Sequence, residues 1–318
     1  MTGYLIRRIG QSIAVVIGVM VLTFIMVHLV PGSAARSALG VKATPARIAA
    51  FNATYGLNQP LYKQFFSYVG QVLHGNLGVS FQFQEQVSTL IGQRLPRDML
   101  LLGISTVLAL IIAIPLGIYQ AVRRNGLTDN LLSAGSFTLY SMPDFFFAIL
   151  LIALFSVQLH WLPPTVPAND TTIGSLIADP SALVLPVLTL TMVTVAGYSR
   201  YMRSSAIDTL AQDYMRVVRA KGLPERLVLS RHVVRNSILP VVTVVGLSLP
   251  GIVAGAVIAE EIFNYPGMGL LFFQAATSHD FPILLGSTLI VGVATVVGNL
   301  AADIAYGVLD PRISHGGY

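Results

Sequence analysis

The amino-acid sequence predicts an all-α integral membrane protein with six transmembrane helices and both termini in the cytoplasm. Of its 318 residues, 54% are hydrophobic and only 10% are charged, whereas soluble domains usually carry about 25% charged residues. Six apolar segments approach or exceed the ~20 residues that cross a bilayer as a helix. Backbone polar groups in lipid must bond within their own segment, so these segments are predicted to be helices.

The six predicted spans are separated by one long loop after the first span and by shorter loops thereafter. Their residue ranges are 9–30, 98–122, 131–159, 183–201, 239–263 and 281–309. The first segment follows Arg7 and Arg8 and precedes a Gly-Ser-Ala-Ala stretch, a pattern that a cleaved signal peptide also shows. Its apolar run is longer than the ~7–15 residues of a signal peptide, so we predict a retained span.

The basic residues set the predicted orientation, because cytoplasmic loops of membrane proteins carry an excess of Lys and Arg. With the N-terminus inside, thirteen of the nineteen basic residues face the cytoplasm, and the other six lie in the long first loop. The two later outside loops contain none. The chain is thereby divided into an N-terminal span (1–30), an extracellular loop with short helices (31–97) and a core of five spans (98–318), which includes a cytoplasmic loop at 202–239.

Six basic residues gather within residues 213–240, which we call the basic segment. Tyr214, Val217, Val218 and Lys221 recur at helical spacing, which predicts a short helix with these residues on one face. Gly222, with a proline two places later, predicts the end of that helix in a left-handed conformation. A second helix is predicted to run from there towards residue 236. Such a segment fits either a helix lying on anionic lipid or a helix docked in the groove of a cytoplasmic partner.

Catalytic and phosphate-binding motifs are missing from the sequence. It contains no HExxH pair, no G-x-S-x-G nucleophile turn and no G-x-x-x-x-G-K-[ST] phosphate loop. Cysteine is also absent, which excludes disulfides and thiolate metal sites. We therefore predict a protein that is not an enzyme and that binds no cofactor or metal of its own.

The basic segment and six further stretches resemble a known family, the permeases of ABC importers. The resemblance is to the B-type subunit of the dipeptide, oligopeptide and nickel branch. It rests on these stretches, in the family's order: YLIRRI with HLVPGSAA, YGLNQPLYKQFFSYVGQVLHGNLGVSF, IPLGIYQAVRRN, SMPDFF, RAKGL followed by His232 and Asn236, EEIFNYPGMGLLFFQAATSHDFP, and DPRI. Many members carry Glu-Ala-Ala where this chain has Arg216, Val217 and Val218, a departure typical of this branch.

The resemblance implies a multi-pass permease subunit of the cytoplasmic (inner) membrane that forms half of a translocation pathway. It implies four kinds of partner: a homologous C-type permease, two cytoplasmic ATPases that bind ATP and Mg, an extracellular binding protein, and lipid. No nucleic acid is expected to bind. Dipeptides, longer peptides, nickel chelates and glutathione are all compatible solutes. An ion-coupled secondary transporter is the alternative, but that class typically shows internal repeats and several charges near the midplane.

The resemblance also implies which residues contact the ATPases. Gly222 would be the hinge, apolar side chains would fill the partner's groove, and polar side chains would line its rim. The implied interface consists of Tyr214, Val217, Val218, Arg219, Ala220, Lys221, Gly222, Leu223, Arg231 and His232.

Three carboxylates are candidates for the translocation path. Asp144 lies near the centre of the third predicted span, where a carboxylate should face a cavity; alternatively it marks a helix start, where acids are favoured. Glu260 and Glu261 end the fifth predicted span at its outer side, before a Pro-Gly turn and a short apolar stretch that should re-enter the interface. Within that span, Gly251 and Gly255 form a GxxxG pattern, which permits close helix packing.

Overall fold

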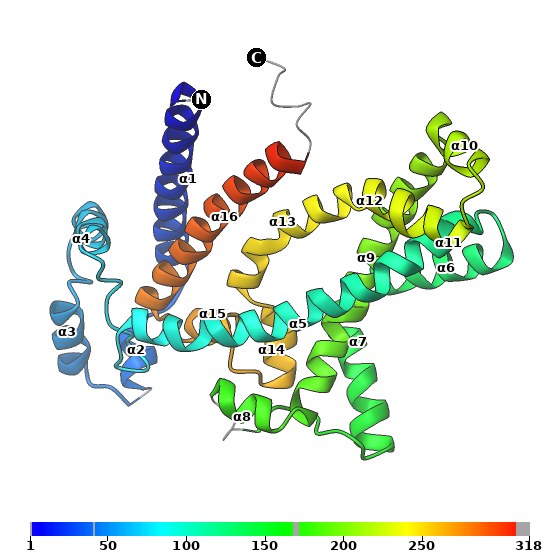
Figure 1. Ribbon diagram of the computed structural model, residues 1–318. Coiled ribbons are helices and arrows are strands. Elements are labelled where there is room, and N and C mark those ends of the chain that lie inside the picture. The colour runs from blue at the N-terminus through cyan, green and yellow to red at the C-terminus, as the bar shows by residue number, and fades with distance from the viewer. Residues whose placement is uncertain (1, 41, 168–171, 310–318) are drawn as a thin grey trace. The chain divides into compact units, whose positions relative to one another are not determined.

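The computed structural model describes residues 2–40, 42–167 and 172–309, and they form helices joined by short loops (Figure 1). Over these residues there is no β-strand, only an isolated bridge between Val79 and Gln86. Four helices are long and apolar enough to cross a membrane, and the number rises to six if each of two bent helix pairs is one span. The all-α membrane class is therefore confirmed. The Asp-Pro-Arg-Ile stretch at 310–313 lies outside the described residues.

The chain folds as two compact units, each assembled from separate stretches of sequence. The first unit contains Met1–Asp98, Val253–Glu261 and Pro266–Val297, and the second contains the remainder. The helices that lie wholly or mainly in the first unit are α1 (Thr2–Leu29), α2 (Ala34–Leu39), α3 (Pro45–Thr54), α4 (Leu61–Leu73), α14 (Val257–Phe263), α15 (Met268–Ser278) and α16 (Phe281–Leu309).

The second unit holds the remaining helices. They are α5 (Val87–Val122), whose first turns belong to the first unit, α6 (Leu127–Ser141), α7 (Asp144–Leu151), α8 (Ile173–Ala178), α9 (Ser181–Leu210), α10 (Asp213–Ala220), α11 (Glu225–Leu227), α12 (Val234–Ser237) and α13 (Leu239–Ala254), with two π-helical stretches, η1 (Ile152–Gln158) and η2 (Val228–Val233). The predicted division at residues 30 and 97 concerns membrane topology and stays a prediction.

The helix that contains the second predicted span starts before that span. Helix α5 starts at Val87, not at residue 98, and runs for 36 residues. At about 1.5 Å per residue it is roughly 54 Å long, well beyond the ~30 Å hydrocarbon core of a bilayer. Its first turns are too polar for hydropathy to include them, although they continue the same helix, and the bounds of the membrane-crossing part stay a prediction.

The third and fifth predicted spans are each broken rather than continuous. Helix α6 and the α7–η1 helix meet at 104°, because Pro143 lacks an N–H and holds Met142 in an extended conformation (ψ 131°). In the fifth segment α13 ends at Ala254 and α14 begins at Val257, with Gly255 between them at φ +79°. Continuous apolar composition concealed both breaks.

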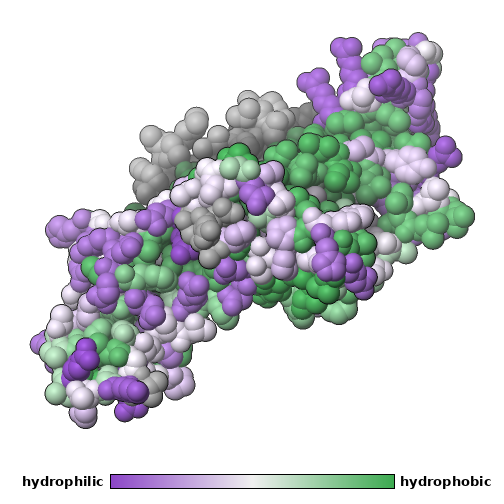
Figure 2. Space-filling view, turned by 90° about the horizontal axis from the view of Figure 1, so that it is seen from below, coloured by the Kyte–Doolittle hydropathy of each residue, from purple (hydrophilic) through white to green (hydrophobic). Residues whose placement is uncertain are grey.

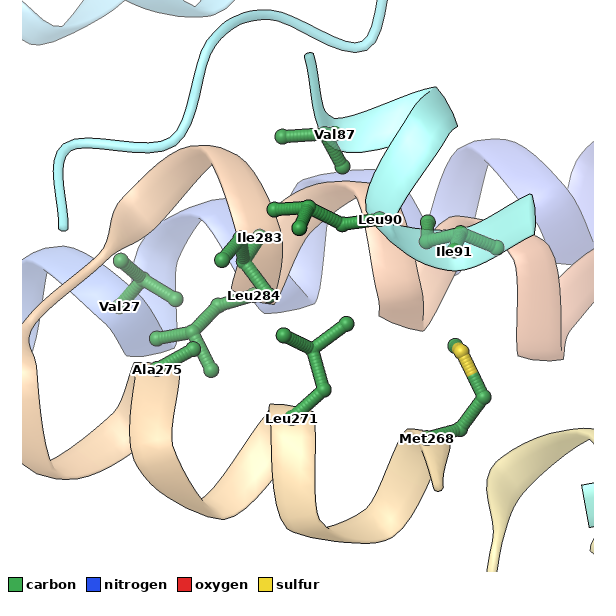
Figure 3. Packing of buried hydrophobic residues seen from close by; sticks show 9 residues of the cluster. All are labelled: Val27, Val87, Leu90, Ile91, Met268, Leu271, Ala275, Ile283 and Leu284. Atoms are coloured by element: carbon green, nitrogen blue, oxygen red, sulfur yellow. The ribbon is translucent and has the colours of Figure 1, made fainter. Parts of the chain in front are cut away.

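A hydrophobic cluster in the first unit joins the first helix of the chain, α1, to the last, α16 (Figure 3). Val27 of α1 lies with side chains from the start of α5, from α15 and from the start of α16. The buried members are Val27, Val87, Leu90, Ile91, Met268, Leu271, Ala275, Ile283 and Leu284. Helix α15, at 11 residues, is too short to span a bilayer, and its apolar face instead completes this core.

Large hydrophobic side chains also cover much of the surface, and Figure 2 shows broad hydrophobic areas on the face it presents. On α1, for example, Leu22, Met26 and Leu29 are all more than half exposed. A soluble protein rarely carries such extensive exposed apolar surface. Such a surface is stable when lipid surrounds it.

Candidate functional site

The basic segment folds as a short helix, a tight turn and a second helical stretch, as predicted. Helix α10 ends at Ala220, and Gly222 follows in the left-handed conformation at φ +74°. Its N–H donates to the carbonyl oxygen of Arg219 at 3.0 Å, which closes the turn. The chain then continues through α11, η2 and α12 before α13 begins at Leu239.

Met215 anchors α10 to the transmembrane helices. Its side chain is 1% exposed and packs in a cluster with residues of α5, α9 and the second helical stretch. The buried members are Ile118, Ala121, Met202, Ala206, Met215, Val228, Val233 and Val241. Any displacement of α10 must therefore move α5 and α9 or break this cluster.

The predicted apolar face of α10 is rotated from the observed one. Tyr214 and Val218 lie half-buried against the cluster, but Val217 is 58% exposed and faces away. The prediction missed Met215, although Met215 and Val218 have the i, i+3 spacing of neighbours on a helix. The observed inward face is centred on Met215.

The outward face of the segment is mostly basic, and Val217 is its most exposed large apolar side chain. Of the residues predicted for the interface, together with the neighbouring Arg216, the exposed ones are Arg216, Val217, Arg219, Ala220, Lys221, Gly222 and Arg231, while Leu223 and His232 are half-buried. Arg219 pairs with Glu225 at 2.9 Å between Nη2 and Oε1. Both side chains are about half exposed, so this pair stabilises the turn only slightly.

Two hydrogen bonds hold the second helical stretch against its neighbours. Asn236 donates through Nδ2 to the Tyr214 hydroxyl at 2.6 Å, which ties α12 to α10. Ser237 donates to the hydroxyl of Thr209 at 2.9 Å, which ties α12 to the end of α9. The basic segment is thus fixed at its base and exposed at its tip.

A buried ion pair lies beside this base, and sequence reasoning missed it. Asp129 receives two bonds from Arg203, from Nε at 2.8 Å and from Nη2 at 2.7 Å, and a third from the N–H of Asn125 at 2.9 Å. The Asp129 side chain is 1% exposed. The pair joins the first turn of α6 to α9, and Arg203 also lines a 440 Å³ cavity with Arg200. A carboxylate just before an apolar run was the available sequence signal.

Asp144 occupies a helix start, as the alternative interpretation held. It is exposed and is the first residue of α7, directly after Pro143. Its negative charge lies where the positive end of the helix dipole favours it. A role in the translocation path stays a prediction.

Glu260 and Glu261, predicted as a pair, lie in different surroundings. Glu261 is exposed, whereas Glu260 is fully buried and accepts the N–H of Ala256 at 2.6 Å and that of Leu270 at 2.9 Å. Asp98, which the sequence analysis did not single out, is buried beside it and accepts the N–H of Met268 at 2.9 Å. The two buried carboxylates thus satisfy the free N–H groups at the starts of α14 and α15.

The GxxxG interpretation of Gly251 and Gly255 is wrong for this structure. Gly255 is not on a helix face, because its positive φ ends α13. A Cβ atom placed on Gly255 would lie 2.5 Å from the N of Gly269 and 2.6 Å from Oε1 of Glu260. The same atom on Gly251 meets nothing within 4 Å.

Within the part of the chain that the structure describes, no group of three His, Asp or Glu side chains is placed to hold a metal ion. The basic segment presents an exposed basic tip on a base that packs against α5 and α9.

Comparison with known proteins identifies the family. Residues 113–315 match the family described as binding-protein-dependent transport system inner membrane component, and residues 1–102 match its N-terminal companion. An oligopeptide transport system permease protein of Bacillus subtilis is 39% identical over 316 residues, which cover 99% of this chain and 100% of that protein.

Two further relatives match over almost their full length. A dipeptide transport system permease protein of Escherichia coli is 34% identical and covers 99% of both chains. A glutathione transport system permease protein of Pectobacterium atrosepticum is 36% identical, covering 99% of this chain and 100% of that one. The chain therefore belongs to the family of inner membrane components of binding-protein-dependent transport systems, and it is a permease subunit of the importer class rather than an ion-coupled secondary transporter.

Proposed function

We propose that the chain forms half of the translocation pathway of an ATP-driven importer for small peptides or related solutes. Support for the solute class comes from the three relatives, which are named for oligopeptides, dipeptides and glutathione. These solutes share amino acids joined through amide bonds. Asp144 and Glu261, which are exposed, are the carboxylates that the proposal assigns to the path or its outer mouth, whereas Glu260 is buried and bonds the backbone beside that mouth.

The proposed assembly contains a homologous C-type permease, two cytoplasmic ATPase subunits and an extracellular binding protein. ATP and Mg²⁺ are bound by the ATPases, because this chain carries no phosphate loop. In this assembly six spans cross the membrane, and both termini and the basic segment face the cytoplasm.

The observation that carries the proposal is the construction of the basic segment. Its tip exposes Val217 among cations, as a docking helix requires. Its base holds Met215 in the same cluster as Met202 of α9 and Ile118 of α5. When ATP binding draws the ATPases together, a groove that grips the tip would pull these two helices and so change access to the pathway.

The proposed orientation predicts opposite labelling of two exposed glutamates. The natural chain has no cysteine, so Glu225→Cys in the basic segment and Glu85→Cys in the first loop each create a unique thiol. In intact cells an impermeant thiol reagent should label Glu85→Cys and leave Glu225→Cys unlabelled until the cells are opened. Labelling of Glu225→Cys in intact cells would show that the chain has the opposite orientation in the membrane.

The hinge predicts an ordered series of substitutions at Gly222. A Cβ there meets nothing within 4 Å, so the penalty is conformational and amounts to ~1–2 kcal/mol for most residues at positive φ. We expect Gly222→Asn to retain function, because Asn tolerates this conformation, and Gly222→Val to lose it, since β-branching narrows the backbone choices further. The measurement is co-purification of the ATPases together with ATP hydrolysis stimulated by peptide-loaded binding protein.

The controls for this series separate docking from folding. Membrane insertion of Gly222→Val should match the wild type, because the spans are unchanged. If the Val variant recruits the ATPases and stimulates hydrolysis normally, then Gly222 is not the hinge and the basic segment needs another explanation.

A further inference from the structure

Helix α4, in the first loop, has two chemically distinct faces. One face is polar and carries Lys63, Gln64, Ser67 and Gln71. The other carries the apolar residues Leu61, Tyr62, Phe65, Phe66, Val69, Val72 and Leu73. Of these, Phe66 is 68% exposed and Leu73 is 80% exposed. A helix surrounded by water would turn such a face inward, so this face requires an apolar covering.

Side-chain contacts fix α4 beside the outer half of α1. The rings of Phe65 and Phe24 meet edge to face with centroids 5.2 Å apart. The Nε2 atom of His28 lies 3.2 Å from Oε1 of Gln64. Figure 1 shows α4 end-on beside α1, so the two helices cross. If α1 spans the bilayer, α4 lies along its surface.

A groove of about 290 Å³ runs between the two helices. Its walls are apolar except for His28 and the Tyr62 hydroxyl. It is lined by Val21, Phe24, Ile25, His28, Leu29, Leu61, Tyr62 and Phe65. Its size is close to the lower end of the range for small-molecule sites, ~300–1,000 Å³.

The opposite face of α4 borders a different kind of cavity. This cavity, of about 350 Å³, is lined by Lys63, Gln64, Ser67 and Gln71 of α4 and, around them, by a mixture of polar and apolar residues that includes Phe81 and Phe281. Helix α4 therefore presents apolar side chains to the groove and polar side chains to this mixed cavity. Helices that lie at the boundary between lipid and water have this arrangement, with one apolar face and one polar face.

The surroundings of the groove identify its occupant. Leu22, Met26 and Leu29 on the same stretch of α1 are exposed apolar residues of a membrane span, and the α1 wall of the groove continues that surface. The residues of α1 that line the groove, from Val21 to Leu29, cover about 12 Å of helix at ~1.5 Å per residue. Interfacial helices insert to a comparable depth of ~5–10 Å.

We propose that α4 is an interfacial membrane helix and that the groove between α1 and α4 binds an acyl chain of a phospholipid. Tyr62 then lies at the level where aromatic side chains gather at membrane interfaces. In the proposed orientation this is the outer leaflet, but the lipid site itself does not depend on the solute or on the ATPases. The acyl chain covers Leu61 and Phe65, and the cavity on the opposite face of α4 then lies at a fixed height above the membrane.

Tryptophan fluorescence in brominated lipid tests the embedding of α4. The chain has a single tryptophan, so Trp161→Phe removes its own emission, and the complex that carries Trp161→Phe alone, in phosphatidylethanolamine–phosphatidylglycerol vesicles, is the blank that is subtracted to remove the emission of the partner subunits. Phe66→Trp should lose most of its emission when the acyl chains carry bromine and should resist aqueous acrylamide. Its neighbour Ser67→Trp, on the polar face, should show the reverse. Leu61→Trp replaces Phe66→Trp if the latter fails to assemble.

A second pair of variants tests the groove. Ile25 lines it, whereas Leu22 lies on the same helix outside it. Both Ile25→Trp and Leu22→Trp should be quenched by brominated chains. Quenching of Leu22→Trp alone would mean that no acyl chain enters the groove. Quenching of Phe66→Trp by acrylamide alone would place α4 in water, and shielding from both quenchers would mean that another protein subunit covers it. Each of these three results overturns the proposal.

Discussion

Gly255→Ala is expected to prevent accumulation of the folded permease, while Gly251→Ala is expected to leave it close to the wild-type level. At Gly255 the backbone has φ +79°, which costs a residue with a Cβ ~1–2 kcal/mol. The new methyl group would also press on Oε1 of Glu260 and on the N of Gly269, and overpacking of this kind typically costs ~1–3 kcal/mol. Together these effects reach ~2–5 kcal/mol.

Gly251 is the matched control, four residues earlier in the same GxxxG pattern. It is exposed on α13, and an added Cβ meets nothing within 4 Å. Alanine there should even favour the helix by roughly 0.5–1 kcal/mol. The measurement is the yield and melting temperature of the purified complex in lipid nanodiscs. Equal losses from the two variants would restore the interpretation of this pattern as a helix-packing face.

The second large effect is expected from Asp129→Leu, which should lower the melting temperature of the complex markedly. The substitution leaves the Arg203 guanidinium without its two bonds to Asp129, and removing one partner of a buried pair costs about 3–5 kcal/mol. The lower end applies here because the Arg203 side chain retains 28% exposure. Asp208→Leu, at an exposed position further along α9, is the control and should have little effect.

A double substitution separates the ion pair from general disruption of α6. Asp129→Leu combined with Arg203→Met removes both charges, and we expect it to recover part of the stability lost by Asp129→Leu alone. Arg203→Lys should also lower the melting temperature, because lysine cannot make the paired contacts of the guanidinium. Additive losses in the double variant would show that the pair is not coupled.

Features that are determined by a short stretch of sequence were predicted well. The turn at Gly222 follows from a glycine, a proline two places on and a preceding amphipathic run, all within a dozen residues. The first span follows from an uninterrupted apolar segment, and α1 covers all of it except Val30. In both cases the physical cause is local, so one sequence is enough to reveal it.

Features that depend on distant partners could not be predicted in this way. Asp129 and Arg203 are 74 residues apart, and neither residue alone indicates the other. Asp98 accepts the N–H of Met268, which lies 170 residues later in the sequence. The bend at Pro143 had a visible signal, but an apolar run on both sides suggested one straight span, because hydropathy measures length and not direction.

The π-helical stretch η2 constrains how the length of this chain can change during evolution. A π-turn holds one more residue than an α-turn, since its bonds run from i to i+5. Because this wide turn absorbs one extra residue, deletion of one residue between Leu227 and Val234 would restore a regular α-helix while the residues on either side keep nearly the same faces. A second deletion would have no extra residue to remove, and it would rotate every later residue by about 100°. Ser237 would then no longer meet Thr209, and Val233 would leave the cluster that holds Met215. These six residues should therefore tolerate the loss of one residue but not of two.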